Sequence, residues 1–373
     1  MSKVRTALVI GGGVAGPVAA LALRKAGIDA TVYEAYPRTA DGIGGSLAIA
    51  PNGLAALEIV GARKAVEDIG MPIPETVMSF GDKEVELPQL SGLPPMRLVQ
   101  RGDLHRALYD VAVVGGVRVE HGRRLVSYDD GPGGVTARFA DGAEATADVL
   151  VGADGVGSRV RAGLLPDFEV VDIGVRCVYG KLPLTDAVRA EVPPAFLRGF
   201  CFASDGTGRG AGFAPVLFRE RPEEYGDYLM VVFTGTPQVL GHSDEELFAL
   251  TPEALWQVVV EGTAGWHPAI REVVAAADAA AAFPITLRSC TRIDPWPTGR
   301  VTLLGDAVHP MTPAAGAGAN TALHDAALLT AALRDRGVDG LAEYEREMIG
   351  HARGVVADSR RRAEQMFGPA RTE

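Results

Sequence analysis

The sequence predicts an α/β fold with two interleaved domains, and three observations support this prediction. The chain opens with a strand, a helix and a strand within about 30 residues, a pattern typical of a parallel βαβ unit. Between about 170 and 290, short strands alternate with glycine-containing turns. A buried strand returns at 301–304. Because no flexible linker separates these parts, we expect a parallel-sheet domain interrupted by an antiparallel sheet and closed by a long helix over 341–367.

Composition narrows the class of protein. The 373 residues are 47% apolar, enough to bury two cores, and the net charge of -11 disfavours nucleic-acid binding, which needs a basic face. The three cysteines are widely spaced, which predicts free thiols in a reducing cytoplasm. The seven histidines show no metal-ligand spacing, so we expect no metal.

The N-terminal βαβ unit comprises a strand over 4–10, a helix over 14–26 that Gly27 stops, and a strand over 30–33. Pro17 fits because it falls in the first helical turn. The uncharged run from 7 to 23 resembles the apolar region of a signal peptide. Four glycines and a proline interrupt it, and it is shorter than a membrane span, so we expect no membrane insertion.

The rest of the chain divides into helices, small sheets and turns. Asp141-Gly142 is a candidate hairpin turn, and Ser243 with Glu246 fits a capping box. Helices are expected over 50–70, 102–114, 243–261, 267–280 and 320–333. Strands are expected in the proline-rich excursion 72–95, in a small sheet of 117–120, 125–128 and 135–139, and over 148–153, 200–203, 210–218, 228–234 and 285–290.

A glycine fingerprint lies between the first strand and its helix. In Gly11-x-Gly13-x-x-Gly16, the first glycine allows a tight turn, the second lets backbone approach a pyrophosphate, and the third lets helix and strand pack closely. The first helical residues, Val14 and Ala15, offer free amides to phosphate. Glu34 ends the second strand 18 residues after Gly16 (34 − 16), about the spacing at which a carboxylate reaches a ribose hydroxyl. The unit therefore predicts a Rossmann-like dinucleotide site for FAD or NAD.

Two further motifs complete a family pattern. One is Val149-Leu150-Val151-Gly152-Ala153-Asp154-Gly155, and the other runs from Val301 to Pro310 through Gly305-Asp306 and continues to Pro313 and Gly316–Asn320. In this order, the three motifs resemble the single-component, class A flavoprotein monooxygenases, which include para-hydroxybenzoate and salicylate hydroxylases and the tetracycline-inactivating monooxygenase. The resemblance covers nearly the whole chain.

The resemblance implies a role for each matching residue. Asp154 belongs to the motif near the FAD phosphates and the pyridine nucleotide, and Asp306 would bind the ribityl chain. Pro313 would lie at the reactive side of the flavin. The resemblance does not imply a particular side chain as catalytic acid or base. The remaining cofactor-binding residues would be Gly11, Gly13, Val14, Ala15, Gly16 and Glu34 at the ADP half, Arg101, and Gly316, Gly318, Ala319 and Asn320 at the isoalloxazine. One departure is Ala35, which stands where many relatives have arginine, so an adenine-side contact would be either lost or supplied by Arg38.

The resemblance also implies a reaction. NADH or NADPH would reduce FAD, O2 would add at the flavin C4a, and the hydroperoxide would hydroxylate a small, electron-rich, aromatic or polyketide-like molecule. His309 and His324 fit structural roles better than catalytic ones. Substrate contacts are expected from the strands of the middle sheet, although each candidate also fits core packing: Tyr179, Arg198, Phe202, Phe213, Met230 and Phe233. Two alternatives stay open, a flavin-dependent reductase or dehydrogenase acting on a double bond and a non-catalytic flavin-binding module.

The expected division of the chain follows from these motifs. An FAD-binding domain would comprise 1–70, 96–170 and 285–340, a substrate domain 71–95 and 171–284, and a C-terminal helix 341–373. The expected assembly is a monomer or homodimer in the cytoplasm, with a small-molecule substrate and O2 as its partners.

Overall fold

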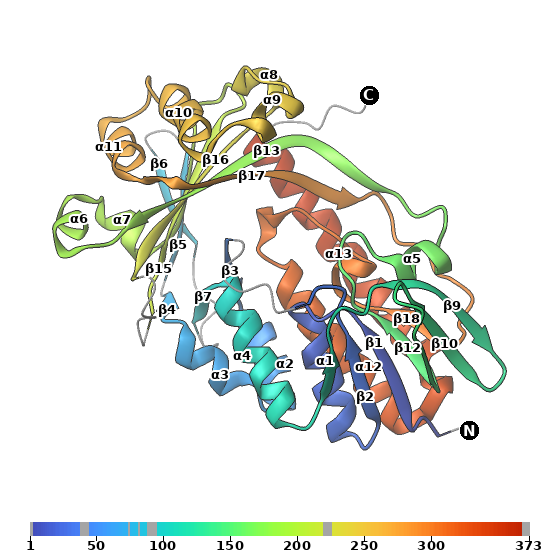
Figure 1. Cartoon of the computed structure of the whole chain (residues 1–373). Coiled ribbons are helices and arrows are strands. Elements are labelled where there is room, and N and C mark those ends of the chain that lie inside the picture. Colours follow the sequence, from blue (N-terminus) through green and yellow to red (C-terminus); the bar gives the residue numbers. More distant parts are fainter. Residues whose placement is uncertain are drawn as a thin grey trace.

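The computed structural model describes residues 3–37, 45–73, 75–80, 83–87, 95–218 and 226–367. Arg38 and part of the expected excursion at 72–95 lie outside these residues. Figure 1 shows two larger sheets side by side, with the long C-terminal helix extending from one toward the other.

A parallel sheet forms the first layer, in the order β18-β12-β1-β2-β8. Its central strand, β1, is almost wholly buried, as expected for a strand covered on both faces. The strands are β1 (Thr6–Ile10), β2 (Asp29–Tyr33), β8 (Arg118–Glu120), β12 (Val149–Gly152) and β18 (Val301–Leu303). Helices α1 (Ala15–Lys25), α4 (Arg101–Val114) and α12 (Gly318–Arg336) surround this layer.

The small antiparallel sheet differs from the expected one. It contains β9 (Leu125–Gly131), β10 (Gly134–Phe139) and β11 (Glu144–Ala147), and the turn at Asp141-Gly142 joins the last two. The strand expected at 117–120 was wrongly assigned to it. As β8, it pairs in parallel with β2, because helix α4 precedes it and returns the chain to the parallel sheet.

A seven-stranded, mostly antiparallel sheet forms the second large layer, in the order β17-β13-β16-β15-β14-β5-β6. Its strands are β5 (Glu75–Phe80), β6 (Lys83–Leu87), β13 (Val170–Pro183), β14 (Gly199–Ser204), β15 (Gly210–Val216), β16 (Tyr228–Gly235) and β17 (Asp278–Cys290). Helices α8 (Pro237–Leu240), α9 (Asp244–Ala249), α10 (Pro252–Gly262) and α11 (Pro268–Ala276) lie on the side away from the parallel sheet, which we call the outer face (Figure 1). The opposite side is the inner face.

Two helices expected next to this sheet were wrong in extent. The helix expected over 243–261 is divided into α9 and α10, because Thr251 caps a new helix that begins at Pro252. The helix expected over 267–280 ends at Ala276, and the alanine-rich stretch after it belongs to strand β17. Pairing with β13 outweighs the local helix preference of alanine.

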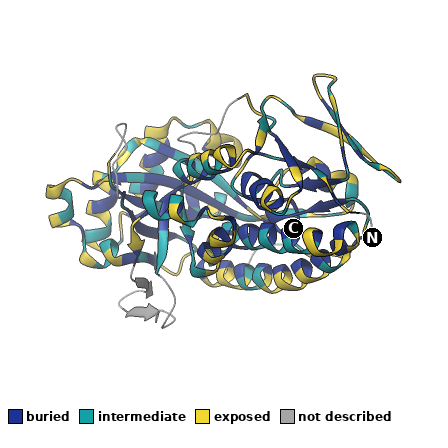
Figure 2. Ribbon diagram, turned by 90° about the horizontal axis from the view of Figure 1, so that it is seen from below, coloured by how far each residue is buried: buried dark blue, intermediate teal, exposed yellow. Residues whose placement is uncertain are grey.

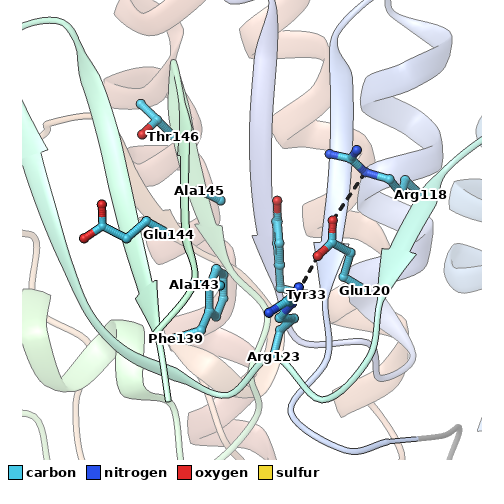
Figure 3. Close-up of a pocket in the computed structure, with 9 residues that line it drawn as sticks. All are labelled: Tyr33, Arg118, Glu120, Arg123, Phe139, Ala143, Glu144, Ala145 and Thr146. Carbon is cyan, nitrogen blue, oxygen red and sulfur yellow. Dashed lines mark hydrogen bonds and ion pairs between the residues drawn. The ribbon is translucent and has the colours of Figure 1, made fainter. Parts of the chain in front are cut away.

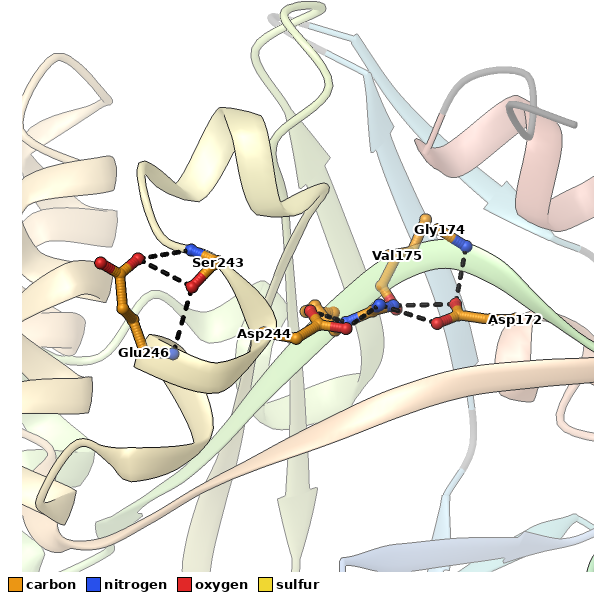
Figure 4. Close-up of polar contacts among 7 residues, drawn as sticks. Asp172, Gly174, Val175, Ser243, Asp244 and Glu246 are labelled. Atoms are coloured by element: carbon orange, nitrogen blue, oxygen red, sulfur yellow. Dashed lines mark hydrogen bonds and ion pairs between the residues drawn. The ribbon is translucent and has the colours of Figure 1, made fainter. Parts of the chain in front are cut away.

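A buried arginine fixes α9 to this sheet, and Figure 4 labels its two acidic partners, Asp172 and Asp244. Arg176, on β13, donates to Asp244 at 2.6 and 2.5 Å and to Asp172 at 2.8 and 2.7 Å. These bonds, that to Asp244 first, raise the pKa of Arg176 despite its burial. The expected capping box at Ser243 and Glu246 is confirmed at the start of the same helix.

The remaining elements connect the layers. A three-stranded sheet contains β3 (Ser46–Ile49), β7 (Met96–Gln100) and β4 (Pro72–Ile73). The helical stretch at 50–70 is two helices, α2 (Pro51–Val60) and α3 (Arg63–Ile69), separated at Gly61, whose φ is 69°. Short helices are α5 (Arg159–Leu164), α6 (Asp186–Glu191), α7 (Pro194–Arg198), η1 (Gly305–Ala307), η2 (Pro313–Ala315) and η3 (Gly337–Gly340).

The long C-terminal helix α13 (Leu341–Phe367) confirms the expected range. Its buried residues recur every three or four positions, and Figure 2 shows long helices with one buried and one exposed side. None of the helices in the described part of the chain is long and apolar enough to cross a membrane. The three cysteines are free thiols, as expected, and the structure buries all three.

Candidate cofactor and substrate site

The three sequence motifs meet at one edge of the parallel sheet. Strands β1, β12 and β18 are parallel neighbours, so the loops at their carboxyl ends lie together. A Cβ placed on Gly11 would be 2.4 Å from the carbonyl oxygen of Ala153, which shows how closely the first two loops approach. A Cβ on Gly305 would be 3.9 Å from that of Ala15, so the third loop reaches the start of α1.

The glycine loop has the shape that a pyrophosphate requires. Gly11 has a φ of 109°, and a Cβ on Gly16 would lie 1.9 Å from the Gly11 carbonyl oxygen, so neither position accepts a side chain. Gly13 is exposed, and a Cβ there would meet nothing within 4 Å. Helix α1 begins with no side-chain cap and no acidic residue in its first turn. Its start therefore lacks a side-chain partner beside the open space at Gly13, which fits the phosphates of FAD.

Glu34 and a residue that sequence analysis missed hold this loop. The Glu34 carboxylate accepts hydrogen bonds from the amides of Gly12 at 2.7 Å and Tyr36 at 2.9 Å. His105, buried on α4, donates through Nε2 to the Gly12 carbonyl. Its only sequence signal is its spacing of four from Arg101, which places both on one side of the helix.

Asp154 supports the neighbouring helix. Its carboxylate accepts from the Ser158 hydroxyl at 2.5 Å and from the amides of Arg159 at 2.7 Å and Val160 at 3.2 Å. These bonds organise the start of α5. The structure therefore gives Asp154 local partners within the loop after β12.

Asp306 is accessible to solvent and is also closely surrounded by protein atoms. Its side chain is exposed, yet surrounding protein atoms desolvate the carboxylate and raise its pKa, while the charges of His309, Arg101 and Arg161 oppose that rise. Such a carboxylate fits a ligand hydroxyl donor.

The start of α12 faces the same region. This helix has no side-chain cap and no acidic residue in its first turn, and Gly318 lies near Asp306, with 3.8 Å between its added Cβ and Oδ1. Gly316 has a φ of 60°. The side-chain amide of Asn320 already has partners within the protein, since its Nδ2 donates to the carbonyl oxygens of Ala48 at 2.9 Å and Gly316 at 3.0 Å. Free helical amides next to Asp306 fit the electron-rich edge of a flavin.

The loop that carries Pro313 is anchored from behind. Pro313 is exposed, whereas Thr312 is buried and bonds through its hydroxyl to that of Ser359 on α13 at 2.6 Å. Ala314 packs against a cluster that includes Phe202 on the inner face and Phe367 of α13. The loop after β18 therefore reaches the inner face of the seven-stranded sheet.

The structure divides the expected substrate residues between the two faces. Tyr179 and Met230 lie on the inner face, where Ser46 donates to both, from its amide to the Tyr179 hydroxyl at 3.1 Å and from its hydroxyl to Met230 Sδ at 3.0 Å. Phe213 and Phe233 are fully buried on the outer face.

The placement of Arg198 in a strand was wrong. It is the exposed last residue of α7. The sheet strand begins one residue later, at Gly199.

A separate surface pocket of about 310 Å³ opens between the parallel sheet and the β9–β11 sheet (Figure 3). Its arginines, Arg118 and Arg123, both turn toward Glu120, at 3.7 and 3.1 Å. Arg123 also pairs with Asp141, so each of the two arginines has an acidic partner, which disfavours an anionic ligand in this pocket.

Comparisons with known proteins agree with this geometry. A family model described as "FAD binding domain" matches residues 4–190 and 261–359. The 3-amino-4-hydroxybenzoate 2-monooxygenase PtmB3 of Streptomyces platensis is 32% identical, over 97% of this chain and 88% of the relative. Aurachin C monooxygenase/isomerase of Stigmatella aurantiaca is 29% identical, over 95% and 88%. The structure of Klebsiella pneumoniae HpxO with FAD and uric acid superposes with a TM-score of 0.82 at 27% identity, over 98% and 89%.

The chain therefore belongs to the FAD-binding-domain family. It is an FAD-dependent monooxygenase, and the resemblance stated from its three motifs is confirmed.

Proposed function

We propose that this monooxygenase hydroxylates a small, electron-rich aromatic molecule, with NADH or NADPH as the electron donor. When bound, FAD supplies the chemistry that carries two electrons from the nicotinamide to O2 and one oxygen atom to the substrate. The relatives support an aromatic substrate, because their printed names and titles include aminohydroxybenzoate and uric acid.

The flavin would lie across the three loops. The pyrophosphate would face Gly13 and the first amides of α1, and Glu34 would lie beside the adenosine ribose. The ribityl chain would reach Asp306, whose carboxylate is within electrostatic reach of Arg101. The isoalloxazine edge would meet the amides of α12, which stabilise the negative charge of reduced flavin by about 0.3–2 kcal/mol.

One observation carries the proposal, namely the contact of Ala314 with the cluster that contains Phe202. It places the loop of Pro313 next to the inner face, so a substrate held there would be close to the reacting end of the flavin. We propose Tyr179, Phe202 and Met230 as substrate contacts. Partly exposed apolar side chains, Phe200, Val232, Phe283 and Ile285, pack beside them.

The inner face also supports the aromatic class. Tyr179 and Phe283 are stacked, with ring centroids 5.0 Å apart, and offer a flat apolar surface. The side chains of Ser46 and Tyr179 bring polar groups to this otherwise apolar surface. This pattern fits a planar ring with a polar substituent.

We also propose the domain division, the assembly and the location expected from the sequence. The three motifs support an FAD-binding part that includes 1–70, 96–170 and 285–340. The free thiols support a cytoplasmic location. For the expected monomer or homodimer, light scattering of the purified protein gives the mass directly.

The test is a turnover experiment with isotopic label. The purified protein should be yellow, and it should oxidise NADH or NADPH faster when a suitable phenol, aminohydroxybenzoate or purine is added. The product should contain one atom of 18O from 18O2. A genuine product without label would instead establish the reductase alternative, and flavin binding without any turnover would favour the non-catalytic module.

A further inference from the structure

A wholly buried ion pair lies behind the loop that carries Asp306. His309 Nε2 is 2.5 Å from Asp325 Oδ2, and both side chains have an exposed fraction of 0%. The same carboxylate oxygen accepts the amide of Gly305 at 3.0 Å, and the His309 amide donates to the Gly305 carbonyl at 2.9 Å. The pair therefore joins the Asp306 loop to helix α12.

Pairing with Asp325 favours the protonated form of His309. Burial alone would lower the pKa of His309, but the charge and hydrogen bond of Asp325, together with the charge of Asp306, raise it overall.

Burial raises the pKa of the Asp306 carboxyl, and a positive charge on His309 opposes that rise, together with the charges of Arg101 on α4 and Arg161 on α5. Cys290 on β17 is also within electrostatic reach of Asp306. His351 on α13 is within electrostatic reach of His309, and burial lowers the pKa of its ring.

We propose that the His309–Asp325 pair positions the cofactor, because its imidazolium supplies the positive charge behind Asp306 and its carboxylate locks the Asp306 loop to α12. The inference rests on the placement of FAD at Asp306 proposed above. His309 is thus a positioning residue that acts on the flavin through Asp306. An ionised Asp306 accepts hydroxyl hydrogen bonds more strongly than a neutral one, so the pair sets the pH range in which FAD binds tightly.

The experiment measures the FAD affinity of the apoprotein, by quenching of flavin fluorescence, between about pH 5 and pH 9. For the unmodified protein, affinity should fall as the pH falls through the pKa of Asp306. His309→Gln removes the charge and retains a hydrogen-bonding side chain. Asp325→Asn removes the hydrogen-bonded counter-charge of His309, so burial should lower the pKa of the ring and favour its neutral form. Both variants should bind FAD about tenfold more weakly at pH 7, and their affinity should be lost at a higher pH.

Glu345→Gln is the matched control. Glu345 is a buried carboxylate on α13 that bonds to Trp296 at 3.1 Å and Thr298 at 2.6 Å. Its removal should lower the melting temperature of the apoprotein without moving the midpoint of the pH dependence. If either His309→Gln or Asp325→Asn fails to fold, the midpoint of the pH dependence of FAD affinity measured for the other variant tests the proposal.

Two contrary results are distinguishable. If FAD affinity falls by the same factor at every pH in His309→Gln and Asp325→Asn, with an unmoved midpoint, the pair is structural only and the inference is overturned. If Asp306→Asn leaves FAD affinity and its pH dependence unchanged, the placement of FAD at Asp306 is wrong, whatever the pair variants do.

Discussion

Arg161 donates a hydrogen bond to the carbonyl oxygen of Ala307 at 2.9 Å, and this bond joins two loops that are far apart in the sequence. The same guanidinium donates to the Val156 carbonyl at 2.6 Å. The loop after β12 and the loop after β18 are therefore fixed relative to each other. Because Asp154 organises the start of the helix that carries Arg161, its contribution to the flavin site is at least partly indirect.

Gly13→Val should abolish tight FAD binding. The side chain would enter the open space that the pyrophosphate requires, and we expect at least about a hundredfold loss of affinity, roughly 2.7 kcal/mol. Fluorescence titration of the apoprotein measures this loss. Gly133→Val is the control, because Gly133 is also exposed with open space around it but lies in the turn between β9 and β10. Equal affinity in the two variants would contradict the phosphate assignment.

Asp306→Ala should weaken FAD binding by about 1.5–3 kcal/mol at pH 7, the worth of a hydrogen bond to a charged group. The melting temperature of the apoprotein should change little, because the carboxylate is exposed. Asp110→Ala, at an exposed position on α4, serves as the control. A loss of apoprotein stability without a loss of affinity would reassign Asp306 to a structural role.

The two faces of the large sheet should respond differently to truncation. Met230→Ala, on the inner face, should raise the KM for the substrate several-fold, whereas Phe233→Ala, on the outer face, should cost about 3–5 kcal/mol of unfolding free energy. Urea unfolding and steady-state kinetics on both variants separate the effects. An unchanged KM in Met230→Ala would remove Met230 from the proposed substrate contacts.

Asp148 should make the stability of the protein depend on pH. Although burial raises its pKa, hydrogen bonds from the amides of Arg5 and Thr6, at 2.7 and 3.0 Å, lower it overall. A carboxyl whose folded pKa is below the unfolded value, about 3.9, stabilises the protein above that value and loses this effect as the pH falls through the folded pKa.

We therefore expect Asp148→Asn to lower the unfolding free energy by about 1–3 kcal/mol at pH 7. The difference from the unmodified protein should shrink as the pH falls. Urea unfolding from pH 7 down through the unfolded pKa of about 3.9 measures this difference in unfolding free energy, with Asp110→Asn as an exposed control. A difference that stays constant with pH would show that the charge of Asp148 is not the cause.

Local patterns were sufficient to predict the parallel sheet and the long helix α13. The glycine fingerprint, the capping box and the buried strands are each defined by residues close together in the sequence, and the structure contains each of them. Long-range pairing was not predictable in this way. The alanines of 279–282 favour a helix by themselves and become strand only beside β13, and the face on which Phe233 lies depends on helices α10 and α11.

The candidate site shows the same division. Gly13 and Asp306 follow from motifs, whereas the contact of His105 with Gly12 and the pairing of His309 with Asp325 require the folded chain. No spacing rule identifies two residues on different elements that meet in a core.

The most direct test of the central claim is an experimental structure of the protein with FAD bound. We predict one FAD per chain, with its pyrophosphate at Gly13 and the first amides of α1, a ribityl hydroxyl within hydrogen-bond distance of Asp306, and the isoalloxazine between α12 and the inner face of the large sheet. A flavin bound elsewhere, for instance in the pocket beside Arg118, or one that contacts the fingerprint loop but not Asp306, would contradict the account.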